Sequence, residues 1–267
     1  MRLIKVPGIN ALGLRGPEKA PDLILKEIEK NSDFENLGNG EIKIDSSNIE
    51  ENNERIYENA KREFEKNSRV VFLGGDHSIS FPILEALGDL KGFENCFLIV
   101  FDAHADCCKP GKEPTHEEWL RALVEIGWRT ENIAIIGTRK IWGEEREFLK
   151  KNKIKVFSCD CNLESAADFI SGKAKGMKTY ISFDMDVCEP SLSPGVNYPE
   201  PNGLNNREFF CLAKRFFHIS SLKGIDIVEI CPEIDKKYDY RSVKLAAKLA
   251  EEFLKIENGK NKMFYRN

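Results

Sequence analysis

The sequence of 267 residues lacks any long apolar segment. A membrane-spanning helix needs about 18 consecutive apolar residues, and no run in the chain approaches that length. The apolar stretch at the N-terminus is interrupted by Pro7 and Gly8, before the core of a signal peptide could form. We therefore expect a cytoplasmic protein that has no membrane partner.

An excess of positive charge is also missing. The chain has 40 Lys and Arg residues against 44 Asp and Glu residues, and its formal net charge is −4. A protein that wraps nucleic acid or coats an anionic membrane usually presents a strong basic field. The charge balance therefore argues against a general polyanion binder, and we expect no nucleic-acid partner.

The cysteine spacing of zinc ribbons and thioredoxin-like sites is absent. Among the eight cysteines, neither Cys107–Cys108 nor Cys159–Cys161 has the two intervening residues of a CxxC pair. Hydrophobic residues make up 41% of the chain, so its core is large enough to fold without disulfides. We expect the cysteines to be reduced structural thiols.

Linkers rich in proline or serine and internal repeats are absent as well. We therefore predict a single domain over residues 1–257, followed by a polar tail over 258–267. Short apolar runs alternate with longer amphipathic stretches, which is typical of buried parallel strands joined by crossover helices in an α/β fold. Strands are expected over 3–6, 42–44, 69–73, 96–101, 133–136, 155–157, 179–183 and 224–230. Helices are expected over 20–30, 50–66, 79–90, 117–126, 144–151, 165–171, 205–217 and 242–257.

Residues that can bind metal follow three of the expected strands directly. The three segments read GGDHS at 74–78, DAHAD at 102–106 and DMD at 184–186. In open parallel sheets, ligands bind beyond the carboxyl ends of the strands. Side chains two residues apart in extended backbone point to the same face, so Asp102, His104 and Asp106 can converge, as can Asp184 and Asp186.

This convergence would bring four carboxylates and two imidazoles to one edge of the sheet. Four negative charges at short range repel one another unless cations neutralise them, and two divalent cations supply the matching charge. A ligand set rich in oxygen, with two nitrogens and no thiolate, suits Mn²⁺ better than structural zinc. A single Asp at a strand end is often only a helix cap, but three such clusters on separate strands favour a binuclear metal site.

These motifs resemble those of a known family, the ureohydrolases, which include arginase, agmatinase and formimidoylglutamase. GGDHS at 74–78, DAHAD at 102–106 and SFDMDVCEP at 182–190 are similar to its three metal motifs in order and spacing. Similar segments also occur near the N-terminus (GPEKAPDLI), at 136–139 (IGTR) and at 226–232 (DIVEICP). The resemblance covers most of the chain. It implies a three-layer α/β/α sandwich with a central, mainly parallel eight-stranded sheet, which makes residues 1–257 one catalytic domain.

The resemblance also implies an activity and a cofactor. The activity is hydrolysis of a guanidino group to urea and an amine, at a centre of two Mn²⁺ ions per chain. The partners it implies are a small guanidino compound and further copies of the chain, in a trimer or a hexamer. Carried over residue by residue, one Mn²⁺ is held by His77, Asp102, Asp106 and Asp184, and the other by His104, Asp102, Asp184 and Asp186.

Three residues match catalytic positions of the family. Asp106 corresponds to the residue that orients the nucleophilic water. Glu229 corresponds to the glutamate that receives the guanidinium, and a carboxylate suits a planar cation with several N–H donors. His116 resembles the mobile proton shuttle to the leaving amine, although Glu117 replaces the glycine that usually follows it.

The segments that would face the substrate depart from arginases. The loop over 107–116 is shorter and lacks the Asn and Ser that hold the α-carboxylate of free arginine. Trp142 stands where arginases have the acidic residue near the α-amino group, and Asn197 lies in a PGVNYP segment closer to formimidoylglutamases. We expect Glu229, Trp142 and Asn197 to contact the substrate. Because apolar surface cannot replace a polar clamp, free arginine is expected to be a poor substrate.

The expected activity is therefore agmatinase-like, since agmatine has no carboxylate to clamp. Four alternatives stay open: a peptide arginase that converts peptidyl arginine to ornithine, a formimidoylglutamase, an arginase, and a metal-binding homologue without activity. Release of urea or formamide from a panel of these compounds would distinguish them.

Overall fold

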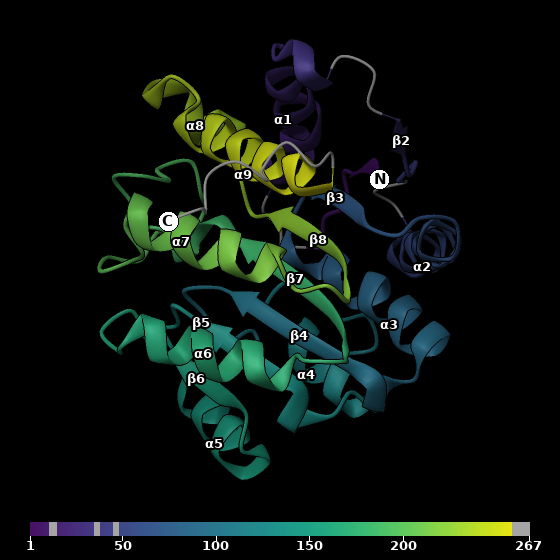
Figure 1. Cartoon of the computed structure of the whole chain (residues 1–267), viewed down its shortest axis with the longest axis vertical. Helices are drawn as coiled ribbons and strands as arrows, with labels where there is room; N and C mark the ends of the chain where they lie inside the picture. The colour runs from purple at the N-terminus through teal and green to yellow at the C-terminus, as the bar shows by residue number, and fades with distance from the viewer. Residues whose placement is uncertain (11–14, 35–37, 45–47, 258–267) are drawn as a thin grey trace.

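The computed structural model describes residues 1–10, 15–34, 38–44 and 48–257 (Figure 1). The expected tail over 258–267 lies outside the described residues. The strands are β1 (Arg2–Val6), β2 (Asn39–Glu41), β3 (Val70–Gly74), β4 (Cys96–Phe101), β5 (Ile133–Ile136), β6 (Lys155–Phe157), β7 (Lys178–Asp184) and β8 (Leu222–Val228). They form one eight-stranded sheet in the order β2-β1-β3-β8-β7-β4-β5-β6, and each neighbouring pair is parallel.

Helices cover both faces of this sheet (Figure 1). One face carries α1 (Ala20–Glu29), α6 (Leu163–Lys173), α7 (Asn206–Phe217) and α9 (Arg241–Glu257). The other face carries α2 (Ile49–Lys66), α3 (Ser80–Lys91), α4 (Trp119–Glu125) and α5 (Gly143–Asn152). A short helix, α8 (Pro232–Asp235), follows β8. The architecture confirms the predicted α/β sandwich around an eight-stranded sheet.

The continuous apolar runs reflect burial of the sheet on both faces. In β4, Phe97, Ile99 and Phe101 belong to the core under α7 and α9. Their neighbours Leu98 and Val100 belong to the core under α3 and α4. Because alternate side chains of a strand point to opposite faces, a strand covered on both sides must be apolar throughout.

Two expected strands differ from the structure. The strand expected over 42–44 lies three residues earlier, as β2. This polar, largely exposed edge strand pairs with β1 alone and carries no apolar pattern. The strand expected over 224–230 ends at Val228, because the next residue, Glu229, adopts a left-handed backbone with φ of 66°.

The thiols agree with the expectation of reduced cysteines, since all eight are free and four of them are buried. None of the helices in the described ranges is long and apolar enough to cross a membrane. The feature that matters most for function is strand order. β3, β8, β7 and β4 are consecutive neighbours, so their carboxyl ends meet at one edge of the sheet.

Candidate functional site

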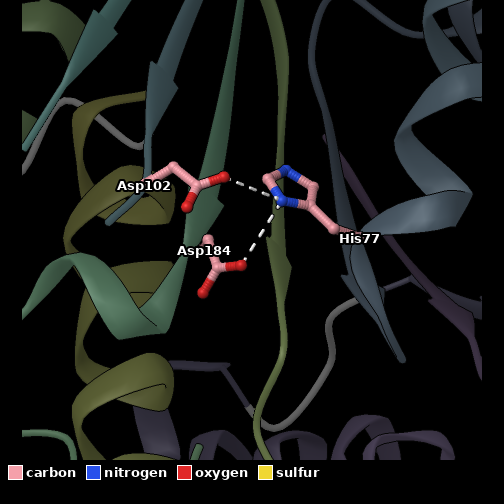
Figure 2. Close-up of side chains that lie close together, drawn as sticks. All are labelled: His77, Asp102 and Asp184. Atoms are coloured by element: carbon pink, nitrogen blue, oxygen red, sulfur yellow. Dashed lines mark ion pairs between the residues drawn. The ribbon is translucent and has the colours of Figure 1, made fainter. Parts of the chain in front are cut away.

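Three metal-binding candidates converge on His77, which follows β3. Its Nδ1 atom lies 3.3 Å from Asp102 Oδ2 and 3.3 Å from Asp184 Oδ2 (Figure 2). Asp106 Oδ2 lies 3.1 Å from the same nitrogen. Carboxylates from the ends of β4 and β7 therefore surround one imidazole nitrogen, as the strand-end motifs predict.

A second cluster forms around His104. Its Nδ1 atom lies 2.7 Å from Asp186 Oδ2 and 3.6 Å from Asp102 Oδ1. The sites share Asp102: one group joins it to His77 and Asp184, and the other joins it to His104 and Asp186. Within these groups the potential ligand atoms lie within 4.8 Å of one another. The structure thus brings all six predicted ligands together and gives Asp102 the position of a bridge.

The tautomer of His77 supports a cation at this position. Ser182 donates its only hydroxyl proton to Asp226 Oδ1, at 2.6 Å. The Ser182 oxygen therefore accepts from His77 Nε2, at 2.8 Å, so the neutral imidazole has its lone pair on Nδ1. Neither His77 Nδ1 nor Asp102 Oδ2 has a hydrogen-bond partner, although both are buried. Two buried acceptors that face each other without a donor can both bind a metal ion placed between them.

The carboxylates are held in place by main-chain donors. The amide of His104 donates to Asp102 Oδ1 at 2.6 Å, and the amide of Asp186 donates to Asp184 Oδ1 at 2.8 Å. Burial raises the pKa of Asp184 well above its ordinary value, and the charges of Asp186 and Asp102 raise it further. Divalent cations would relieve this crowding of negative charge.

Trp119, on α4, orients one of the predicted catalytic residues. Its indole Nε1 donates to Asp106 Oδ2 at 2.9 Å, and its ring lies 4.5 Å from the His77 ring. Asp106 has a positive φ of 48°, a strained backbone for a residue that is not glycine. This conformation and the indole hydrogen bond together aim the carboxylate at the cluster.

A cavity of about 270 Å³ opens beside the two clusters. Its lining includes Asp106 and Asp184 from the clusters. It also includes the three residues that the sequence predicts to contact the substrate, Glu229, Trp142 and Asn197. His116 also lines it. The structure therefore gathers every residue that the sequence suggested for catalysis or substrate binding around one space.

Glu229 is buried at the edge of this cavity. Its Oε1 accepts the main-chain N–H of His77 at 2.7 Å, and its own N–H donates to Gly75 O at 2.9 Å. Burial raises the pKa of Glu229 well above its ordinary value, and the nearby charge of Asp76 adds to this effect. Within the described residues, no lysine or arginine forms an ion pair with Glu229, so a cationic ligand would complete its surroundings.

His116 is 6% exposed, and neither ring nitrogen has a hydrogen-bond partner. Its Nδ1 lies 4.0 Å from Asp76 Oδ2, and its Nε2 lies 3.9 Å from Glu117 Oε1. The Tyr198 ring packs beside it, with 5.8 Å between ring centroids. An unpartnered imidazole on a cavity wall is suited to exchange a proton with a ligand.

The outer part of the cavity combines aromatic and charged side chains. Trp142 is 58% exposed, and the ammonium group of Lys140 lies 5.2 Å from its ring centroid. Glu200, which also lines the cavity, lies 3.9 Å from His104 Nε2. The mouth therefore offers an apolar surface and charges of both signs.

Arg139, in the IGTR segment, ties the loops of the site together through main-chain oxygens. Its guanidinium donates to the carbonyls of Asp186 and Glu200 at 2.8 Å each, and to that of Pro201 at 2.9 Å. It also reaches the carbonyls of Gly137 and Val187. One side chain thus links the metal-binding segment after β7 to the loop that carries Glu200.

The chain also matches a known family. The model of the arginase family matches residues 10–255. The chain belongs to the arginase family. It is 32% identical over 191 residues to a mitochondrial arginase of Medicago truncatula, with 69% of this chain and 54% of that protein covered.

Other arginase-family members carry other names. An N(1)-aminopropylagmatine ureohydrolase of Thermus thermophilus is 31% identical over 190 residues, with 68% of this chain and 62% of that protein covered. The crystal structure of a formimidoylglutamase from Bacillus subtilis has a TM-score of 0.86 at 23% identity, over 98% of this chain and 88% of that chain. The matches thus span less than two thirds of the two curated relatives, and the mixture of names leaves the substrate open.

Sequence reasoning missed three residues that support this arginase-family site. Ser182 lies inside the third metal motif, and Asp226 is an acid in the middle of an apolar strand, so both carried a usable signal. Trp119 gave no such signal, because its contact with Asp106 depends on how the intervening loop folds.

Proposed function

We propose that this chain is a hydrolase that splits a guanidino group into urea and an amine, with two Mn²⁺ ions bound per chain. The observation that carries the proposal is the pair of ligand groups that share Asp102, beside a cavity that also contains buried Glu229. The oxygen-rich donor set with two imidazoles suits Mn²⁺. Two divalent cations bound there would lower the pKa of water and so supply hydroxide near neutral pH.

The proposed ligand sets follow the family motifs. His77, Asp102, Asp106 and Asp184 hold one ion, and His104, Asp102, Asp184 and Asp186 hold the other. Residues 1–257 act as one catalytic domain, in a homo-oligomer that we propose to be a trimer or a hexamer. Light scattering on the purified chain tests the oligomeric state.

The residues around the cavity divide the remaining work. Glu229 receives the planar guanidinium through charge-assisted hydrogen bonds and so orients the carbon that is attacked. Asp106, fixed by the indole of Trp119, accepts a hydrogen bond from the attacking water and directs it. His116 donates a proton to the leaving nitrogen, so that a neutral amine departs instead of an amide anion.

For the substrate we propose a guanidino compound without an α-amino acid head, with agmatine first. Trp142 and the short loop over 107–116 support this choice, because the exposed indole offers apolar and cation–π contacts to the chain and ammonium group of agmatine, whereas the loop lacks the Asn and Ser that would hold a carboxylate. Asn197 on the cavity wall would contribute an amide to the tail of the substrate. Peptidyl arginine also fits, because a peptide has no free head to be clamped.

One observation favours a second candidate, a substrate whose tail carries a carboxylate. Two acids of the cavity lining each face an imidazole: Glu117 lies 3.9 Å from His116, and Glu200 lies 3.9 Å from His104. Lys140 lines the same cavity, and no carboxylate of the described residues pairs with it. Guanidinobutyrate and formimidoylglutamate both carry the negative charge that Lys140 would bind.

The deciding experiment measures products from a substrate panel after chelation and reloading with Mn²⁺. Urea release is measured from agmatine, free arginine, guanidinobutyrate and an arginine-containing peptide, and formamide release from formimidoylglutamate. We expect two Mn²⁺ per chain and the highest kcat/KM on agmatine. Free arginine as the best substrate would contradict the role of Trp142, and formamide as the only product would move the chain to the formimidoylglutamase branch. Two bound ions without turnover of any compound would identify a non-catalytic homologue.

A further inference from the structure

The loop between β4 and α4 carries His116 over the cavity and is anchored at several points. On one side it contacts α2, where Asn53 Nδ2 donates to Glu113 Oε2 at 2.6 Å. On the other side it contacts the segment that leaves β1, through Asn10. His116 makes no hydrogen bond through its ring, so these anchors and the packing of Tyr198 determine where the imidazole lies.

Asn10 makes two contacts that act on the same imidazole. Its side-chain Nδ2 donates to Pro114 O at 2.9 Å, two residues before His116. Its main-chain N–H donates to Asp76 Oδ2 at 2.7 Å. Asp76 Oδ2 is also the atom that faces His116 Nδ1, at 4.0 Å. Asn10 therefore fixes both the carboxylate and the loop that brings the imidazole toward it.

Asp76 itself is held rigidly. Its other oxygen, Oδ1, accepts from the main-chain N–H of Ser78 at 3.1 Å and from the Ser78 hydroxyl. Its own N–H donates to Gly8 O at 3.1 Å, where the chain leaves β1. A Cβ on Gly75 would lie 2.0 Å from Gly8 O, so the two segments approach as closely as backbone allows. The segment that leaves β1 is thus part of the wall behind His116.

We propose that Asn10 is a positioning residue for His116: its amide holds the loop so that the imidazole stays between Asp76 and the cavity. The inference rests on the proposed function, in which His116 donates a proton to the leaving nitrogen. Asn10 is neither one of the candidate metal ligands nor part of the cavity lining. Its loss should therefore reduce proton transfer through His116 and leave metal binding unchanged.

The test compares Asn10→Ala with the wild-type chain in two measurements. The first is the rate at which diethyl pyrocarbonate modifies His116, followed by peptide mass spectrometry. Loss of one side-chain hydrogen bond should raise the population ratio of released to held loop by about fivefold. The reagent reaches His116 when the loop is released, so we expect His116 to react about fivefold faster. The second is kcat of the Mn²⁺-loaded protein, which should fall by at most about fivefold, because only the held loop presents the imidazole, with KM and bound Mn²⁺ unchanged.

A double mutant distinguishes an effect of Asn10 that acts through His116 from a general effect on the fold. In a His116→Ala background, Asn10→Ala should lower kcat no further, because the residue through which it acts is gone. Multiplying losses would overturn the proposal, as would unchanged reactivity of His116. Asn53→Ala is the matched control, since it removes a side-chain anchor of the same loop at Glu113 but leaves the contacts of Asn10 with Pro114 and Asp76 in place, and we expect smaller changes than those of Asn10→Ala in both measurements. Equal effects of the two variants would show that only general loosening of the loop is involved.

A second variant at Asn10 tests the same hydrogen bond. Asn10→Asp retains the size of the side chain but presents an acceptor to Pro114 O, and it should reproduce both effects even if Asn10→Ala folds poorly. If the wild-type chain hydrolyses no compound of the panel, the proposed function fails. The modification rate of His116 still decides whether Asn10 holds the imidazole.

Discussion

Replacing Ser182 by alanine removes the group that fixes the tautomer of His77. In the wild-type chain, the Ser182 oxygen accepts from His77 Nε2 at 2.8 Å, and its hydroxyl donates to Asp226 at 2.6 Å. Alanine would leave the Nε2 proton buried without an acceptor, which costs about 1–3 kcal/mol. The imidazole can relieve this cost by carrying its proton on Nδ1, the atom that faces the carboxylates. A proton there competes directly with a metal ion.

The expected result is weaker Mn²⁺ binding at one site only. Removal of the hydrogen-bond partner of a metal-binding histidine usually lowers affinity by about 10- to 100-fold, or about 1.4–2.7 kcal/mol. The site that contains His104 should keep its affinity, because no hydrogen bond joins Ser182 to His104 or Asp186. The affinity of the site that contains His77 should therefore fall relative to that of the site that contains His104.

The assay is a Mn²⁺ titration in competition with a chelator of known affinity. Ser80→Ala is the control, since Ser80 donates to Asp226 Oδ2 at 2.9 Å and makes no hydrogen bond with His77. Its titration should match that of the wild-type chain. Unchanged Mn²⁺ affinity in Ser182→Ala, or the same loss in both variants, would refute the argument from the tautomer.

The remaining predictions concern other parts of the chain. His116→Ala should lower kcat by about 10²–10⁴-fold with bound Mn²⁺ unchanged, and a drop of less than about threefold in the same assay would exclude a role in proton transfer. Asp102→Asn and Asp184→Asn should reduce Mn²⁺ content and activity more than Asp186→Asn, because the first two are the proposed bridges, and equal activity of all three would contradict that assignment. Burial raises the pKa of Glu252, but two neighbouring lysines outweigh this effect and lower it from 4.5 to about 2. The stabilisation by Glu252 is thus complete above pH 4.5 and is lost as the pH falls toward 2. The difference in unfolding free energy between the wild-type chain and Glu252→Gln should shrink over this range, and a difference independent of pH would argue against the ion pairs.

The sheet and the metal cluster were predictable because both depend on short-range patterns. The run Cys96–Phe101 marks a strand buried on both faces, and the motif that follows it places Asp102 at the carboxyl end of that strand. His104 and Asp106 lie in the loop beyond, and the left-handed φ of 48° at Asp106 shows that extended backbone alone does not bring them together. Parallel strands then bring separate motifs to one edge without any further information. Strand β2 was predicted three residues too late, because an exposed edge strand needs no apolar side chains to mark its position.

The supports of the site were harder to predict, because they join positions far apart in the sequence. Asn10 contacts Pro114, 104 residues away, and Arg139 contacts Glu200, 61 residues away. Such pairs depend on the path of loops, which no periodic pattern records. The sequence motifs predict the residues that we propose to carry the chemistry, whereas the three-dimensional structure is needed to identify those that hold them in place.

The contacts of Arg139 have a consequence for how this site can diversify. Its partners are carbonyl oxygens of the main chain, which every amino acid supplies. Substitutions at Glu200 or its neighbours therefore leave the anchoring of the loop intact while they change the side chains presented to a ligand. Substitutions in the mouth of the cavity can therefore accumulate without moving the candidate metal ligands that follow β7. A descendant of this sequence can acquire a new ligand preference without rebuilding the proposed metal centre.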